Sequence, residues 1–222
     1  MVEWVCRAAG QARTVDAVAV ATDDERVARA VRAFGGTVLL TSRDHQTGTD
    51  RVAEAAGTMD HRIIVNIQGD EPLINPEAID EAVRPLIDDE SIAMATLKKR
   101  IESRGELEKE SVVKVVTDGH GFALYFSRAP IPFVRDEEEG VFPARLYYKH
   151  IGLYAYRRDF LLRLASLPPT PLEAAEKLEQ LRALENGYRI RVVETAHDSV
   201  AVDTADDLNR VREIVGASVS AK

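Results

Sequence analysis

The sequence predicts an α/β fold: a mostly parallel sheet with helices on both faces and a small antiparallel insertion. Apolar runs alternate with amphipathic segments from residue 2 to residue 97, which is the pattern of a layered α/β protein. Residues 16–21 (DAVAVA) form an apolar run typical of a parallel strand buried on both faces. Residues 66–72 (NIQGDEP) directly follow the apolar run 63–65, so we expect them at the carboxyl end of a strand. In open α/β sheets, ligands bind at that edge.

The first half of the chain supplies the alternating helices and strands. A helix is expected at 2–9. After the strand at 16–21, the sequence Thr22-Asp23-Asp24-Glu25 has the pattern of a capping box and so begins a helix, which Gly35-Gly36 ends. The next elements are expected, in order, as a strand at 37–40, a helix at 49–56, a strand at 62–67, a helix at 76–86 behind the cap Asn75, and a strand at 92–97.

The second half of the chain breaks this alternation. Strands are expected at 112–116, 122–126 and 146–156 without regular helices between them, and residues 118–121 (DGHG) have the composition of a hairpin turn. An antiparallel insertion is therefore predicted at about 112–156. Beyond it we expect a helix at 159–165, a helix from the capping box at Thr170 to the stop signal at 186–187, short strands at 190–193 and 200–202, and a final helix after Thr204.

Composition restricts the class of protein. The chain has 222 residues, of which 45% are hydrophobic and 30% charged, and we expect a single soluble domain over 1–222. No run approaches the roughly twenty apolar residues of a membrane span, and the N-terminus lacks the pattern of a secretory signal, so no membrane partner is expected. Cys6 is the only cysteine, which excludes an intrachain disulfide and fits a cytoplasmic location.

Charge and motif content exclude several functions. The net charge of -8 argues against a nucleic-acid partner, because nucleic-acid-binding proteins usually carry a basic surface. It does not argue against small anionic substrates, which need only a few local Arg and Lys side chains. The chain contains neither GxGxxG nor GxxxxGKS/T, which speaks against a dinucleotide-dependent dehydrogenase and a Walker-type NTPase.

Asp70 is the carboxylate that the strand at 62–67 would deliver to the ligand-binding edge. A carboxylate there suits Mg²⁺, which takes few protein ligands and shares the others with substrate phosphates. From these residues alone, an ordinary aspartate that caps a turn is an equally good interpretation. Asp203 also follows an apolar strand and precedes a helix cap, and its alternative role is to interact with the positive N-terminus of the final helix.

Several segments together resemble one family, the 3-deoxy-manno-octulosonate (Kdo) cytidylyltransferases, also called CMP-Kdo synthetases. The segments occur in the family's order and cover almost the whole chain, although each alone is weak. They are VATDD (20–24), HQTGTDR (45–51), NIQGDEP (66–72), VKVV (113–116), YFSRAPIP (125–132), HIGLYAYR (150–157), LEQLR (178–182) and VDT (202–204). The resemblance implies a Rossmann-like nucleotide-diphospho-sugar transferase fold and a homodimer.

The same resemblance implies a reaction. The anomeric hydroxyl of Kdo attacks the α-phosphate of CTP, giving CMP-Kdo and pyrophosphate for lipopolysaccharide biosynthesis. Such in-line phosphoryl transfer is catalysed mainly by positioning and by neutralisation of charge. CTP and Kdo are therefore the expected substrates, and Mg²⁺ is the expected cofactor.

Site residues carry over from the family to the matching positions. Asp70 and Asp203 match metal-binding aspartates and, with Gln68, form the expected catalytic group. Thr49, Arg51 and Gln68 match the nucleotide-binding residues. The sugar-acid pocket is expected to hold a bidentate arginine for the Kdo carboxylate, together with donors and acceptors for a polyhydroxylated chain; its residues are Arg128, His150, Tyr154, Glu179 and Gln180.

Structural interpretations stand beside these roles. Thr49 and Arg51 also suit a plain helix start. His150 and Tyr154 also suit ordinary strand packing, and because they are four residues apart they share a face of a regular strand in either case.

The chain departs from the family at its start. In the family, a first strand and a basic loop of the type Arg-Leu-Pro-Gly-Lys, which holds the triphosphate, precede the helix that matches 2–9, and the sequence shows neither. The sheet is therefore expected to lack a strand between those at 16–21 and 62–67. Low activity is expected for the 222-residue chain, and higher activity for a version extended upstream. Glu110-Ser111 is a smaller departure that concerns local loop geometry.

Two alternatives remain open at this point. One is a cytidylyltransferase that acts on another sugar acid, such as an acylneuraminate or an amino analogue of Kdo. The other is a non-catalytic remnant that binds nucleotide or sugar weakly, or only dimerises.

Overall fold

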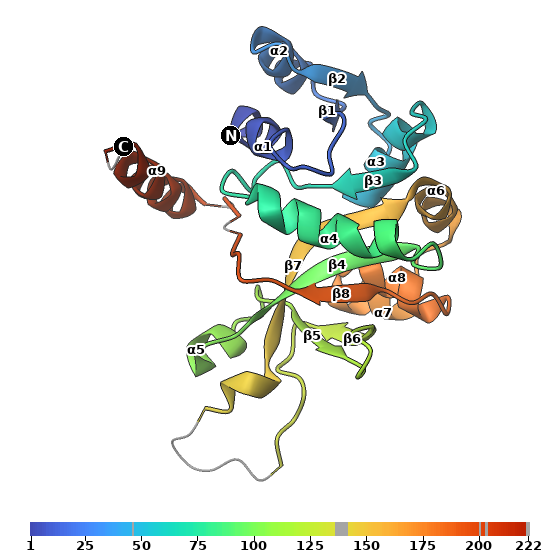
Figure 1. Ribbon diagram of the computed structural model, residues 1–222, viewed down its shortest axis with the longest axis vertical. Coiled ribbons are helices and arrows are strands. Elements are labelled where there is room, and N and C mark those ends of the chain that lie inside the picture. Colours follow the sequence, from blue (N-terminus) through green and yellow to red (C-terminus); the bar gives the residue numbers. More distant parts are fainter. Residues whose placement is uncertain (46, 136–141, 200, 203, 221–222) are drawn as a thin grey trace.

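The computed structural model describes residues 1–45, 47–135, 142–199, 201–202 and 204–220, the last six as backbone only, and it confirms an α/β fold (Figure 1). The helices are α1 (Val2–Ala9), α2 (Glu25–Ala33), α3 (Gly48–Gly57), α4 (Pro76–Asp88), α5 (Arg104–Leu107), α6 (Arg158–Ser166), α7 (Pro171–Glu176), α8 (Gln180–Glu185) and α9 (Ala205–Ser220), with a 3₁₀ turn at Ala144–Leu146. The strands are β1 (Ala19–Thr22), β2 (Thr37–Leu40), β3 (Ile63–Asn66), β4 (Met94–Arg100), β5 (Lys114–Thr117), β6 (Ala123–Ser127), β7 (Tyr148–Arg157) and β8 (Arg191–Glu194). Among these helices, none combines the length and apolar character needed to cross a membrane.

The main sheet is mixed. Strand β7 runs antiparallel to β3, β4 and β5, while β6 pairs antiparallel with β5 and β8 adds parallel to β4. β3 and β4 therefore point in the same direction, but β7 lies between them. The sequence predicted a mostly parallel sheet, and this is corrected because the second half of the chain returns through the middle of the sheet instead of at its edge.

Strands β1 and β2 form a separate parallel pair, with Ala19 opposite Thr37 and Thr22 opposite Leu40. In the part of the chain that the structure describes, β1 pairs with no other strand and β3 pairs only with β7. The strand order is therefore interrupted between β1 and β3, where the sequence predicted a gap. Figure 1 shows β1, β2, α1 and α2 grouped beyond β3.

Helices cover both faces of the main sheet, as predicted, with α4 in front and α6, α7 and α8 behind in Figure 1. Side chains alternate between the faces along each strand. In β4, Ala95 and Leu97 join an apolar cluster with α4, whereas Met94 joins a second cluster on the opposite face. The first cluster also contains Ile79, Val83 and Leu86 of α4, Ile151, Leu153 and Ala155 of β7, and Val5 and Ala9 of α1. The second contains Phe160, Leu161 and Leu164 of α6, Leu181 of α8, and Phe126 and Tyr156.

Two predicted elements differ from the structure by more than a shift of their ends. The helix predicted from Thr170 to 186–187 is two helices, because Lys177 adopts the left-handed conformation (φ 55°, ψ 47°) and ends α7. The break lets Leu178 enter the core and begins α8 with the buried Gln180. The strand predicted at 200–202 is wrong for Ala201 and Val202, which lie in no strand, and Val200 lies outside the described residues. Val202 instead donates its N–H to a loop carbonyl, that of Asp70.

Replacement of Ile79 by Ala tests the packing of α4 on the sheet. Ile79 is fully buried, so we expect Ile79→Ala to lower the free energy of unfolding by about 2–5 kcal/mol. Ile87, on the same helix, is 50% exposed and provides a matched control, for which we expect a loss of about 0.5 kcal/mol or less. Urea denaturation measures both, and equal losses would contradict the assignment of the buried face.

Candidate active site

The loop from β3 to α4 places Gln68 and Asp70 at the carboxyl end of β3, as predicted. The Glu71 N–H donates to the Gln68 carbonyl (3.3 Å), and the Ile74 N–H donates to the Glu71 carbonyl (3.1 Å). These successive turns leave Gln68 exposed and Asp70 half-buried, whereas Glu71 is buried. The edge of the sheet therefore carries two adjacent carboxylates, one accessible and one enclosed.

Glu71 joins this loop to the chain segment after β8. Its Oε2 accepts a hydrogen bond from the Ser199 hydroxyl at 2.6 Å. Burial raises the pKa of Glu71, the Ser199 hydrogen bond opposes that rise, and the charge of Asp70 adds to it. Further along the same segment, the Val202 N–H donates to the Asp70 carbonyl (2.9 Å). Asp203, the second predicted metal ligand, lies outside the described residues.

A row of aromatic rings lines the face of β7 that looks away from α4. Ring centroids lie 5.1 Å apart for Phe126 and His150, 5.2 Å for His150 and Tyr154, and 5.8 Å for Tyr154 and Tyr156. His150 and Tyr154 thus share a face, as their spacing predicted. Burial raises the pKa of Tyr154 well above 10, and the neighbouring Tyr156, Glu179 and Glu71 add to the effect, so its hydroxyl stays protonated.

His150 is a neutral ring in this row, since burial lowers its pKa to about 3. Its Nε2 lies 2.9 Å from the Thr96 hydroxyl, which also lies 2.8 Å from the Leu153 carbonyl. A hydroxyl has one proton to donate, and the carbonyl can only accept. Nε2 therefore carries the imidazole proton and donates to Thr96, which leaves Nδ1 as an acceptor.

The N-terminus of α3 meets the start of α8 beside this row. The Thr49 N–H donates to Glu179 Oε2 (3.2 Å), and the buried Thr49 hydroxyl is hydrogen-bonded to Tyr156. A Cβ atom at Gly48 would lie 3.8 Å from Gln68 Nε2, so the Gln68 amide lies against the same helix end. Five predicted site residues are therefore brought to one region: Thr49, Gln68, His150, Tyr154 and Glu179. The next residue, Gln180, is buried, and its Nε2 has no hydrogen-bond partner in the described chain.

The two predicted arginines are tied to loops and strand ends. Arg51 donates to the Thr41 hydroxyl (2.7 Å) and pairs with Asp23 (3.2 Å), which joins α3 to the ends of β1 and β2. Arg128 donates from Nε to the Glu176 carbonyl (2.8 Å) and from Nη1 to the Glu110 carbonyl (3.1 Å). Neither guanidinium contacts the residues grouped around Thr49 through an observed hydrogen bond.

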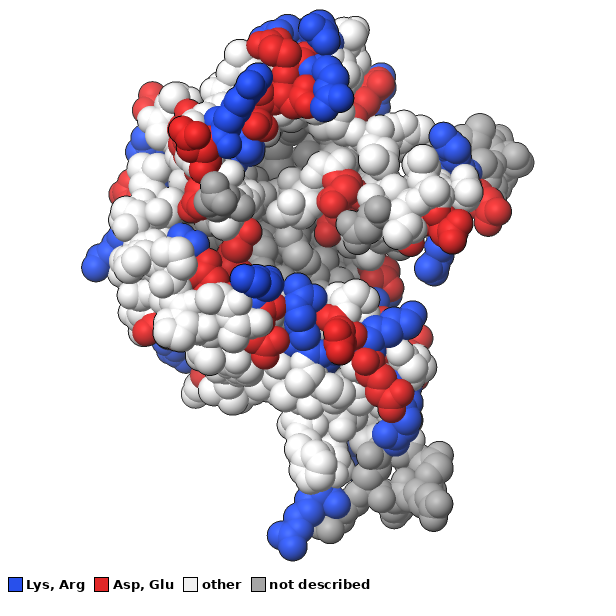
Figure 2. Space-filling model, turned by 180° about the vertical axis from the view of Figure 1, so that it is seen from behind, with Lys and Arg blue, Asp and Glu red and all other residues white. Residues whose placement is uncertain are grey.

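Figure 2 shows the molecule hollowed near its centre, with acidic and basic side chains around the hollow.

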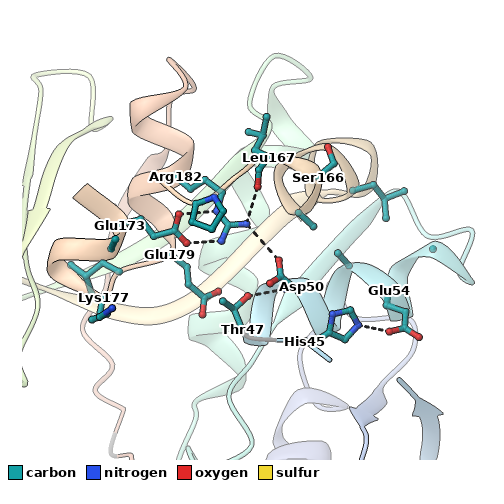
Figure 3. Close-up of a pocket in the computed structure, with 17 residues that line it drawn as sticks. His45, Thr47, Asp50, Glu54, Ser166, Leu167, Glu173, Lys177, Glu179 and Arg182 are labelled. Atoms are coloured by element: carbon teal, nitrogen blue, oxygen red, sulfur yellow. Dashed lines mark hydrogen bonds and ion pairs between the residues drawn. The ribbon is translucent and has the colours of Figure 1, made fainter. Parts of the chain in front are cut away.

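A pocket of about 960 Å³ lies beside this region, between α3 and the α6–α8 segment (Figure 3). Its floor carries Arg182, which donates to both carboxylate oxygens of Glu173 (2.8 and 2.6 Å) and pairs with Asp50 (3.5 Å). The walls are mainly apolar, with Ala53, Leu162, Ala165, Leu167 and Leu178. Of the predicted site residues that the structure describes, Glu179 alone lines it, so the pocket adjoins the predicted site without coinciding with it.

Comparison with known proteins decides the family. A family model described as Cytidylyltransferase matches residues 1–190. The 3-deoxy-manno-octulosonate cytidylyltransferase of Geobacter sulfurreducens is 58% identical over 219 residues, which cover 96% of this chain and 88% of the relative. The protein of the same name from Geobacter metallireducens is 59% identical, over 96% of this chain and 86% of the relative. The chain belongs to the 3-deoxy-manno-octulosonate cytidylyltransferase family.

Solved structures agree with this membership. The structure of CMP:2-keto-3-deoxy-manno-octonic acid synthetase complexed with CTP superimposes with a TM-score of 0.90 and 42% identity, over 98% of this chain and 88% of the other. 4-Diphosphocytidyl-2C-methyl-D-erythritol synthase from Anaerococcus prevotii has a TM-score of 0.62 at 12% identity, which shows a shared fold alone. The sequence-based identification of an enzyme of the Kdo cytidylyltransferase family is therefore confirmed.

One buried side chain that positions Arg128, that of Lys114, was not predicted from the sequence. Lys114 is fully buried, and its Nζ donates to the carbonyls of Lys109 (3.0 Å), Val112 (2.6 Å) and Arg128. Its burial lowers the pKa of the ammonium group. The three carbonyls come from the segment before β5 and the end of β6, so one lysine fixes the backbone from which Arg128 extends. The signal that could have found it is a lysine inside the otherwise apolar run 112–116.

An NMR titration of His150 tests the electrostatics of the aromatic row. The His150 pKa of about 3 lies below the ordinary 6.5, so we expect its ring resonances to stay those of a neutral Nε2-protonated imidazole from pH 8 down to about pH 4. Between these pKa values the unfolded chain binds the extra proton, so the contribution to stability is complete above pH 6.5 and is lost as the pH falls toward 3. A His150→Gln variant identifies which resonance belongs to His150. A titration midpoint near pH 6.5 would contradict the lowered pKa of this ring.

Proposed function

We propose that this chain couples CTP and Kdo to give CMP-Kdo and pyrophosphate, a reaction of lipopolysaccharide biosynthesis. The observation that carries the proposal is the convergence of Thr49, Gln68, Tyr154 and Glu179 beside Asp70 at the carboxyl end of β3. The names of the relatives at 58% and 59% identity, and the CTP complex at a TM-score of 0.90, support the same conclusion.

Thr49, Arg51 and Gln68 are the proposed nucleotide-binding residues. Thr49 is the second residue of α3, whose N-terminal N–H groups and positive dipole end favour bound anions. The exposed amide of Gln68 lies against the same helix end and can reach a ligand bound there. Arg51 holds Asp23 and Thr41, so its proposed contribution to CTP binding includes fixing the strand ends that border α3.

The sugar acid is proposed to contact the aromatic face of β7 and the start of α8. Protonated Tyr154 offers a hydroxyl donor, and neutral His150 offers Nδ1 as an acceptor. Gln180 Nε2 is a buried donor without a partner among the described residues, which fits a sugar hydroxyl as its acceptor. Arg128 must exchange at least its Glu110 contact to grip the Kdo carboxylate in a bidentate manner.

Mg²⁺ is the proposed cofactor, with Asp70 and Asp203 as the residues that would hold it. In the described chain no group of three or more His, Cys, Asp or Glu side chains is arranged to hold a metal ion. A site with a single half-buried aspartate at a sheet edge still fits Mg²⁺, which commonly takes one or two carboxylates and completes its shell with phosphates and water. When bound, the ion supplies charge neutralisation at the phosphate being transferred.

Catalysis by this chain then consists of positioning. The anomeric hydroxyl oxygen of Kdo forms a bond to the α-phosphorus of CTP as the bond from that phosphorus to the bridging oxygen breaks; the hydroxyl proton passes to water and pyrophosphate leaves. The α3 end and Gln68 hold the nucleotide, while His150, Tyr154 and Gln180 hold the sugar, so that attack occurs in line. The packed aromatic row restricts the rotation of these groups before the substrates arrive.

We propose a cytoplasmic homodimer built from one domain over 1–222. The exposed apolar residues Leu124, Phe133 and Leu146 (63%, 89% and 43% exposed) all belong to the segment around the predicted insertion 112–156. Exposed apolar side chains of this kind suit contact with a second copy. Sedimentation of the purified chain would report the mass of the assembly.

Replacement of Asp70 by Asn tests the proposed reaction. We expect Asp70→Asn to lower kcat/KM for pyrophosphate release from CTP and Kdo by about 100-fold or more, because an amide is a poor ligand for a hard cation and leaves phosphate charge uncompensated. Asp88, exposed at the end of α4, provides the matched control, and Asp88→Asn should retain the wild-type rate. Full activity of Asp70→Asn would contradict the proposal.

A panel of sugar acids separates the alternatives in the same assay. Faster turnover of an acylneuraminate or an amino analogue than of Kdo would assign another sugar acid. Calorimetric binding of CTP without turnover of any acid would favour a non-catalytic remnant. Turnover that is fastest with Kdo is the expected result.

A further inference from the structure

The connection from β8 to α9, whose described residues are 195–199, 201–202 and 204, is held against the main sheet by strands β4 and β7. The Thr195 N–H donates to the Lys98 carbonyl (2.9 Å). The Asp198 carboxylate pairs with Lys149 of β7 (2.9 Å) and Lys99 of β4 (3.1 Å). Lys149 also pairs with Glu106 of α5, at 2.7 Å. The first part of the connection is therefore fixed by one backbone hydrogen bond to β4 and by an ion-pair network.

The second part of the connection is held by the Asp70 loop. The Ser199 hydroxyl donates to Glu71 Oε2 (2.6 Å), and the Val202 N–H donates to the Asp70 carbonyl (2.9 Å). Glu71 is 8% exposed, and a Cβ atom at Gly152 of β7 would lie 3.7 Å from its Oε1. The Glu71 carboxyl group thus lies between β7 and the connection, and it fills a space that a side chain at residue 152 would border.

We propose that Glu71 and Ser199 are positioning residues that fix the connection beside Asp70. Their hydrogen bond and the bond from Val202 to the Asp70 carbonyl join the same two chain segments within a few residues of each other. A single backbone bond permits rotation of one segment about the other, whereas two bonds at separate points define a register. The inference rests on the proposed function, in which the Asp70 carboxylate holds a cation.

Residues that do not contact a metal ion can still affect its binding, because they orient the residues that do. Residues that hold ligand-bearing segments from behind often change metal affinity or activity by 10–100-fold when replaced, although they do not contact the ion. Glu71 follows Asp70 directly, and the connection that Ser199 holds donates the Val202 N–H to the Asp70 carbonyl. Loss of their hydrogen bond is therefore expected to act on the cation site first and on overall folding second.

Hydrogen exchange at the Val202 amide tests the positioning in the free protein, without substrate or metal. We expect Glu71→Ala to accelerate this exchange by about tenfold, the size expected for loss of one buried hydrogen bond. Glu71→Gln keeps an acceptor for the Ser199 hydroxyl and should stay within about threefold of wild type. The exposed Glu108 provides the control Glu108→Ala, which should leave the exchange unchanged. Unchanged exchange in Glu71→Ala would overturn the proposal.

Mn²⁺ binding in the presence of CTP, followed by electron paramagnetic resonance, connects the positioning to the cation site. We expect about tenfold weaker Mn²⁺ affinity in Glu71→Ala and in Ser199→Ala, and no further loss in the double variant, because both remove the same bond. Ser199→Ala removes only a hydroxyl and supplies the readout if Glu71→Ala does not fold.

Two outcomes separate this inference from the proposed function. Wild-type Mn²⁺ affinity in folded Ser199→Ala would leave only a structural role and overturn the inference, whatever the enzyme's activity. If the exchange and Mn²⁺ results hold but wild-type protein turns over no sugar acid with CTP, the proposed function fails while the positioning stands.

Discussion

The antiparallel passage of β7 between β3 and β4 is the constraint on which the site depends. One face of β7 packs Ile151, Leu153 and Ala155 into the cluster beneath α4. The even-numbered residues His150, Tyr154 and Tyr156 must then face the opposite side, where the aromatic row meets α3 and α8. Because side chains alternate along a strand, a register shift of one residue in β7 would exchange the two sets. Core packing and presentation of the site are therefore set by the same strand register.

The charge of the region explains why a cation is central to the proposed chemistry. Asp70, Glu71 and Glu179 gather near the end of β3, while His150 and Tyr154 are held neutral by burial. CTP and a sugar acid are both anionic, so they would be repelled by this set of carboxylates without a mediating charge. The two predicted arginines are engaged with Asp23 and with backbone carbonyls. Asp70 is the half-buried carboxylate at the sheet edge, whereas its neighbour Glu71 is buried and accepts a hydrogen bond from Ser199 of the connection between β8 and α9.

Local sequence patterns predicted many of the helices and strands, because the period of apolar residues depends on the local backbone conformation. Apolar periodicity placed β2 and α1 at their observed bounds and placed Asp70 at the end of β3. The central position of β7 was not predictable, since strand pairing depends on partners distant in sequence that periodicity does not encode. The break at Lys177 was missed because a left-handed residue is ordinarily marked by Gly or Asn, not lysine. Burial of Glu71 and Lys114 was missed because charged residues are expected at the surface, and only the tertiary contacts supply their partners.

Crystallography of the chain with CTP and Mn²⁺ tests the central claim most directly, because anomalous scattering locates the ion without assumptions about its ligands. The account predicts an anomalous peak about 2.1–2.2 Å from an Asp70 carboxylate oxygen, the range for a hard cation of this size, with a nucleotide phosphate oxygen as a further ligand. A manganese ion held by phosphates alone, with the Asp70 carboxylate turned away from it, would contradict the account.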